Sequence, residues 1–168
     1  MIFSERRDKI MAGPLDGIKV VELGQFQQGP VATMRLGDLG ADVIKVEAPT
    51  GDPGRGFMRL VAVDAGLTGR NYYFEGHNRN KRSIVLDLKK EKGLEVFFKL
   101  IDWADVFVNN LSINAPDRMG IGYEVLRKRN PRLIYAHTSG WGKKGPDADA
   151  LSFDYTGVAR CGHQSRLY

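Results

Sequence analysis

Short apolar segments rich in β-branched residues alternate along the chain with longer amphipathic segments. The segment 18–23 reads Ile-Lys-Val-Val-Glu-Leu, which is typical of a strand. The clearest helix lies at 91–103, where Leu94, Phe97 and Ile101 share one apolar face. The whole pattern predicts strands at 18–23, 42–47, 83–88, 106–109 and 133–137, and helices at 30–39, 91–103, 114–120 and 123–129.

Proline and glycine mark the ends of several predicted elements. Pro30 is placed at the first position of its helix, where a proline loses no hydrogen bond, and Gly40 ends that helix. Gly, Pro and Asp predict a long loop at 49–69, and loops of that length are often functional. Strands separated by helices predict an α/β fold with a mostly parallel, doubly wound sheet.

The length of 168 residues is that of one ordinary domain. We assign 14–160 to this domain and expect 1–13 to be a disordered or irregular extension. No apolar run approaches the ~18–20 residues that span a bilayer. The first ten residues are too charged for a secretory signal, so no membrane is expected and a cytoplasmic location is favoured.

A net charge of +5 favours an anionic partner. Aromatic residues are not interleaved with the basic ones, so a nucleic acid is not expected. The three histidines lack the spacing of metal ligands, and the single cysteine, Cys161, forms no intrachain disulfide, so no metal is expected. A small molecule that carries phosphate fits this charge, although a solvated basic surface would give the same composition.

Polar residues and glycines follow the predicted strands, at the edge of the sheet where open α/β folds bind ligands. Gly24 and Gly29 would let the backbone approach a ligand closely. Asn110 follows the fourth strand and could contact a ligand or cap a helix, and Arg118 could bind a phosphate. The glycine-rich segment 140–145 could close over a site or remain a basic turn.

A cationic turn with Arg79, Lys81 and Arg82 leads directly into the third predicted strand. Basic side chains gathered at the start of a strand could hold a phosphorylated ligand against a rigid edge of the sheet. The dinucleotide fingerprint and the P-loop pattern are both missing after the first strand, which weighs against NAD and nucleoside triphosphates.

Several segments in consistent order resemble the class III CoA-transferases, the formyl-CoA transferase or CaiB/BaiF type. The resemblance covers nearly the whole chain, from 14 to about 159, and matches the N-terminal portion of the family. Its motifs are Pro14-Leu15-Asp16-Gly17, Gly29-Pro30, Leu39-Gly40-Ala41-Asp42, Asn80-Lys81-Arg82-Ser83-Ile84-Val85-Leu86-Asp87-Leu88, Ala104-Asp105-Val106, Asp117-Arg118-Met119-Gly120 and Asn130-Pro131-Arg132-Leu133-Ile134.

The resemblance implies a Rossmann-like large domain that binds coenzyme A, here incomplete, in a homodimer of interlocked chains. Ala48 stands where the family usually has an arginine that meets the nucleotide, and Arg55 could substitute for it. The implied CoA contacts are Gln27, Gln28, Leu86, Asp87, Leu88, Lys89, Asn110, Leu111, Ser112 and Arg118.

The reaction implied by the resemblance is CoA transfer from an acyl-CoA to a carboxylic acid through an aspartyl-CoA thioester. That aspartate follows the Asp154 region in the family, so no catalytic residue is assigned here. The segment 161–168 departs from the family pattern, and we expect an N-terminal CoA-binding fragment that is inactive alone.

Two alternatives remain open at this stage. One is an enzyme like α-methylacyl-CoA racemase, although Phe153 stands where the racemase has a histidine. The other is a non-catalytic remnant that binds CoA or only dimerises.

Overall fold

The structure is a computed structural model that describes residues 13–56 and 71–162. The predicted extension 1–13, loop 49–69 and tail 161–168 therefore lie largely outside the described residues. The elements are β1 (Lys19–Leu23), α1 (Gln28–Asp38), β2 (Asp42–Glu47), η1 (Pro53–Arg55), α3 (Tyr72–Asn78), β3 (Lys81–Val85), α4 (Glu91–Trp103), β4 (Val106–Asn109), α5 (Ala115–Arg118), α6 (Tyr123–Arg129), β5 (Ile134–His137) and α7 (Asp154–Arg160).

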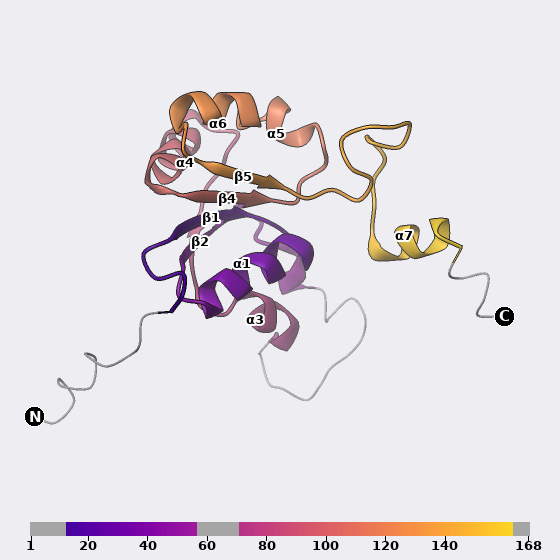
Figure 1. The fold of residues 1–168 in the computed structure, drawn as a ribbon, viewed down its shortest axis with the longest axis horizontal. Helices are drawn as coiled ribbons and strands as arrows, with labels where there is room; N and C mark the ends of the chain where they lie inside the picture. The colour runs from indigo at the N-terminus through magenta and orange to yellow at the C-terminus, as the bar shows by residue number, and fades with distance from the viewer. Residues whose placement is uncertain (1–12, 57–70, 163–168) are drawn as a thin grey trace, which may run out of the picture.

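The described strands form one parallel, five-stranded sheet in the order β3-β2-β1-β4-β5. Helices α1 and α3 cover one face, and α4, α5 and α6 cover the other (Figure 1). This arrangement confirms the predicted α/β fold class. The chain builds β2 and β3 on one side of β1 and then β4 and β5 on the other, so the order reverses between β1 and β4. In open sheets such a switch point is where ligands bind.

Two apolar clusters fix the layers, because successive side chains of a strand point to opposite faces. Val20 lies in the cluster under α1, whereas Val21 lies in the cluster under α4. Phe97 and Ile101 of α4 are fully buried against Phe107 of β4. Burial of each such side chain contributes roughly 1.5–3 kcal/mol, which explains why the apolar stripe at 91–103 predicted this helix correctly.

Several element boundaries differ from the prediction. Strand β3 begins at Lys81 and ends at Val85, rather than spanning 83–88, because its last pairing partner on β2 is Glu47. Helix α1 begins at Gln28, two residues before Pro30, so Pro30 is not the first helical residue. Helices α3 and α7 and the 3₁₀ turn η1 were not predicted, since α3 and α7 bury no residue and carry no apolar stripe.

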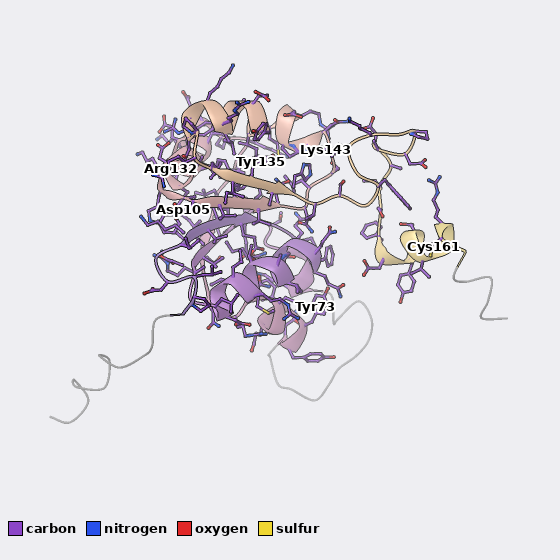
Figure 2. All side chains as sticks on the ribbon, viewed as in Figure 1. Tyr73, Asp105, Arg132, Tyr135, Lys143 and Cys161 are labelled. Atoms are coloured by element: carbon purple, nitrogen blue, oxygen red, sulfur yellow. The ribbon has the colours of Figure 1, made fainter. Side chains whose placement is uncertain are left out.

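Helix α7 and the loop before it project from the edge of the sheet (Figure 1). Cys161 is exposed beside this helix, apart from the sheet (Figure 2). Within the residues that the structure describes, no helix has the length and apolar character that crossing a bilayer requires.

Candidate functional site

A cavity of about 220 Å³ opens at the carboxyl ends of β1 and β2 and beside the segment that follows β3. Its lining is mostly apolar, with charged groups at a few positions. The apolar side chains are Leu23, Val46, Ala48, Pro49, Leu86, Leu88, Leu111 and Met119, and the charged ones are Glu47, Asp52, Asp87 and Lys89. The site therefore lies at the edge of the sheet that the strand pattern predicted.

The segment 86–89 is held in place where β3 ends. The Leu86 amide donates to the Glu47 carbonyl oxygen over 2.9 Å, which continues the β2–β3 ladder by one bond. The Lys89 amide then donates to the Asp87 carboxylate over 3.0 Å, forming a turn that leads into α4. Leu86 and Leu88 are buried in the core cluster, whereas Lys89 is exposed. A cation is thereby presented at the cavity on a fixed backbone.

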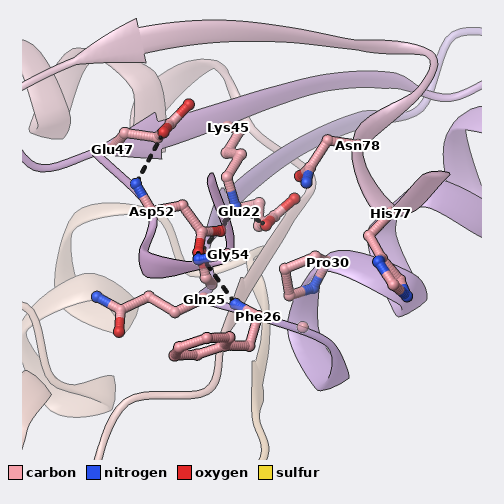
Figure 3. Close-up of polar contacts among 12 residues, drawn as sticks. Glu22, Gln25, Phe26, Pro30, Lys45, Glu47, Asp52, Gly54, His77 and Asn78 are labelled. Carbon is pink, nitrogen blue, oxygen red and sulfur yellow. Dashed lines mark hydrogen bonds and ion pairs between the residues drawn. The ribbon is translucent and has the colours of Figure 1, made fainter. Parts of the chain in front are cut away.

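A buried charged network lies next to the cavity on the α1 side of the sheet (Figure 3). The Lys45 Nζ atom lies 2.8 Å from Glu22 Oε1, 2.9 Å from Asp52 Oδ2 and 2.8 Å from the Gly24 carbonyl oxygen. All three charged side chains are almost wholly inaccessible to solvent. The ammonium group thus bridges two carboxylates while it fixes the start of the β1–α1 loop.

The cationic turn before β3 does not line the cavity, and its basic side chains pair with carboxylates of this chain. Lys81 is buried and its Nζ atom lies 2.7 Å from Glu22 Oε2. Burial lowers the pKa of Lys81, and the Glu22 carboxylate opposes that effect. Arg79 pairs with Asp38 at 2.5 Å, and Arg82 pairs with Asp42 at 2.6 Å. These residues lie at the start of β3, at the end of the strand away from the cavity, and of their partners only Glu22 is buried.

Glu47 and Arg55 form a bidentate pair at the cavity. Arg55 Nη2 donates to Glu47 Oε1 over 2.7 Å, and Arg55 Nε donates to Oε2 over 2.8 Å. Hydrogen bonds from Arg55 lower the pKa of the Glu47 carboxyl from 4.5 to about 2, assisted by Ser83 and the Asp52 amide. Arg55 also stacks on Phe74, with Cζ 3.9 Å from the ring centroid. The expected substitute for the arginine missing at Ala48 is therefore engaged with Glu47.

Asp52 holds the β1–α1 loop from the side of β2. Its Oδ1 atom accepts hydrogen bonds from the Phe26 amide over 3.2 Å and the Gly54 amide over 2.8 Å. Phe26 has a φ of 58°, a left-handed conformation that is uncommon for a bulky side chain. The loop thus keeps a strained backbone because charged side chains from β2 and its following turn determine it.

The implied CoA contacts fall into two groups in the structure. Leu86, Asp87, Leu88, Lys89 and Leu111 line the cavity together. The remaining five lie outside its lining and differ in their surroundings. Gln27, Gln28, Ser112 and Arg118 are exposed, and Asn110 is partly buried.

Two of these outer residues have identified partners. Gln27 hydrogen-bonds to Tyr73 of α3, and this bond partly offsets the effect of burial, which raises the pKa of Tyr73. Asn110 Oδ1 accepts from the Gln25 amide over 2.8 Å, and Asn110 Nδ2 donates to the Gln25 carbonyl over 2.9 Å. Their side chains are thus committed within the protein.

Sequence reasoning missed Glu47, Asp52 and Met119 as cavity residues and Lys45 as their neighbour. The predicted strand at 42–47 carries a signal for two of these residues. Every second residue of a strand points to the same face, so Lys45 and Glu47 share one face. No group of three or more His, Cys, Asp or Glu side chains could hold a metal ion within 13–56 and 71–162.

Comparison with known proteins gives one consistent family. The family model for CoA-transferase family III matches residues 15–166. The cinnamoyl-CoA:phenyllactate CoA-transferase of Clostridium sporogenes is 39% identical over 90% of this chain and 37% of its own length. The formyl-CoA:oxalate CoA-transferase of Streptomyces avermitilis is 43% identical over 92% of this chain and 36% of its own length. The chain thus spans about a third of the length of the curated relatives it matches.

Solved structures agree in fold as well as in sequence. Rv3272 from Mycobacterium tuberculosis superposes with a TM-score of 0.83 at 36% identity, covering 94% of this chain and 43% of that protein. A CAIB/BAIF family protein from Brucella suis superposes with a TM-score of 0.80 at 39% identity, covering 90% of this chain and 40% of that protein.

Proposed function

This chain belongs to CoA-transferase family III, and we propose that it forms the CoA-binding part of an enzyme that transfers CoA between an acyl-CoA and a carboxylic acid. The observation that carries the proposal is the cavity itself, where residues 86–89 and Leu111 converge. In the family resemblance those positions are CoA contacts. We propose that 14–160 is the CoA-binding unit.

The chemistry of the cavity suits one portion of CoA. At about 220 Å³ it is smaller than the ~300–1,000 Å³ of pockets that enclose a whole drug-sized ligand. Apolar side chains suit a ring or an alkyl chain, and the Lys89 ammonium group suits a phosphate. Glu47 and Asp52 would repel an anion if unpaired, but Arg55 and Lys45 neutralise them. The rest of CoA would extend along the neighbouring loop at 110–112.

We assign CoA binding, rather than the transfer chemistry, to the described residues. The resemblance places the nucleophilic aspartate after the Asp154 region, so we assign that role to none of the described carboxylates. The racemase alternative is not favoured, because the curated relatives named above are CoA-transferases and because Phe153 replaces the racemase histidine.

Homodimer formation remains part of the proposal. Leu151, Phe153 and Tyr155 are strongly exposed apolar side chains on and before α7, and such groups are often covered in an assembly. Sedimentation of the chain at several concentrations would test this, and a monomer at all concentrations would contradict it.

Calorimetric titration of the 168-residue chain with CoA tests the binding proposal. We expect saturable binding that Lys89→Ala weakens roughly tenfold, the value of one charge-assisted hydrogen bond. Lys99→Ala is the matched control, because Lys99 is an exposed lysine of α4 outside the cavity lining. Arg118→Ala shows whether CoA also contacts the surface outside the cavity, because Arg118 is an exposed, implied CoA contact that does not line the cavity. The absence of CoA binding by the unaltered chain would reject the proposed function.

A further inference from the structure

The loop that follows β4 is tied to the loop that follows β1 by one side chain. Both polar atoms of the Asn110 amide group are engaged with the Gln25 backbone, at 2.8 Å to its nitrogen and 2.9 Å to its oxygen. The two residues are 85 positions apart in the sequence. This pair of bonds therefore joins the two halves of the sheet rather than stabilising one turn.

A second side chain fixes the same segment from the opposite side. His137, at the end of β5, has its Nε2 atom 2.9 Å from the Leu111 carbonyl oxygen. A carbonyl only accepts, so Nε2 must carry the proton, in either the neutral or the charged imidazole. Asn110 and Leu111 are consequently held from β1 on one side and from β5 on the other.

The position of this tie is the switch point of the sheet, since β1 and β4 are the strands between which the order reverses. Close packing around it uses the glycines that the sequence suggested for ligand approach. A Cβ on Gly29 would lie 3.4 Å from Asn110 Cγ, and one on Gly24 would lie 3.0 Å from Pro30 Cδ. The space beside these glycines is therefore filled by protein.

We propose that Asn110 and His137 are positioning residues of the CoA site. Asn110 holds the 110–111 segment to the β1–α1 loop and His137 holds it to β5, so that Leu111 keeps its place in the cavity lining. Each polar side-chain atom of Asn110 makes one bond to Gln25, which fixes the amide group and leaves it one N–H and one lone pair. The inference rests on the proposed function, because it assigns a role within the same CoA site.

The test measures CoA affinity and amide hydrogen exchange for the 168-residue chain and four variants. Asn110→Ala removes both bonds to Gln25, and His137→Ala removes the bond to Leu111. His137→Gln keeps a side-chain N–H donor and serves as the conservative rescue. Asn130→Ala is the matched control, because Asn130 Nδ2 donates to the Ile101 and Ala104 carbonyls at the opposite end of β4.

We expect Asn110→Ala and His137→Ala to bind CoA roughly three- to tenfold more weakly, as the loss of one or two partly exposed hydrogen bonds predicts. His137→Gln should retain most of the affinity. The Gln25 amide should exchange faster in Asn110→Ala without any ligand. Asn130→Ala should lose stability but keep its affinity for CoA, provided that all proteins are compared below their unfolding temperatures.

Each contrary result has one meaning. Unchanged affinity in both alanine variants, or equal loss in Asn130→Ala, would overturn the positioning role. Faster exchange at Gln25 that leaves CoA affinity intact would show that the tie serves the fold alone. If the unaltered chain binds no CoA, the proposed function fails, and the positioning role at a CoA site fails with it; the exchange measurement then decides whether the tie exists.

Discussion

Replacing Glu47 by glutamine should remove a pH-dependent part of the stability of this protein. The Arg55 pair lowers the pKa of Glu47 from 4.5 to about 2. Because the folded-state pKa is the lower one, the contribution is fully present well above pH 4.5 and is lost as the pH falls toward 2. The pKa difference corresponds to about 3 kcal/mol.

The expected effect is smaller than that figure, because half of the Arg55 side chain is exposed and solvent screens the pair. We therefore expect Glu47→Gln to lower the free energy of unfolding by roughly 1.5 kcal/mol at pH 7. The gap between the two proteins should narrow to roughly 1 kcal/mol near pH 3.5.

Urea unfolding followed by the fluorescence of Trp103 and Trp141 would measure this gap at several pH values. The difference between the wild type and the variant matters, because other carboxylates titrate equally in both. A gap that stays constant from pH 7 to 3.5 would refute the linkage to Glu47. A gap that widens on acidification would show that the pKa is raised rather than lowered.

Three further substitutions test how the fold supports the site. Gly93→Ala places a Cβ 2.1 Å from the Asp87 carbonyl oxygen, so it should destabilise the fold by about 1–3 kcal/mol and weaken CoA binding by moving the 86–89 segment. Gly76→Ala meets no atom within 4 Å in α3 and should raise stability by up to about 1 kcal/mol with unchanged affinity, as thermal unfolding and calorimetry would show. Lys45→Ala leaves Asp52 buried without its cation, while Glu22 keeps Lys81, and it should cost roughly 3–5 kcal/mol in urea unfolding. A loss below about 1 kcal/mol would contradict the buried network.

The elements that the sequence predicted best are those with local signals. Strand β2 and helix α4 have the predicted bounds of 42–47 and 91–103, because an alternating or helical apolar pattern and the following polar residues are both visible in a short window. Helix α3 gave no such signal, since it buries no residue and begins where the Asn71 side chain accepts from the Phe74 amide. Such a helix depends on a cap and on its neighbours.

The site could be predicted only where the family resemblance reached it. Residues 86–89 and Leu111, which the resemblance implies as CoA contacts, line one cavity, and their contact with CoA stays a prediction. The role of the cationic turn could not be read from spacing, because Lys81 meets Glu22 across 59 positions of sequence. A lysine beside a strand looks the same in the sequence whether it faces solvent, a phosphate or a buried carboxylate.

The buried charges next to the cavity are better explained by the loop they hold than by the stability they add. Burying Lys45, Glu22 and Asp52 carries a desolvation penalty that an apolar cluster of similar volume would avoid. An apolar cluster, however, could not bind the Gly24 carbonyl or the Phe26 amide, which Lys45 and Asp52 hold. Without those bonds the left-handed Phe26 would relax toward ordinary backbone angles, and the loop that borders the cavity would change shape. We infer that this sheet retains buried ions because the geometry of its ligand-facing loop depends on them.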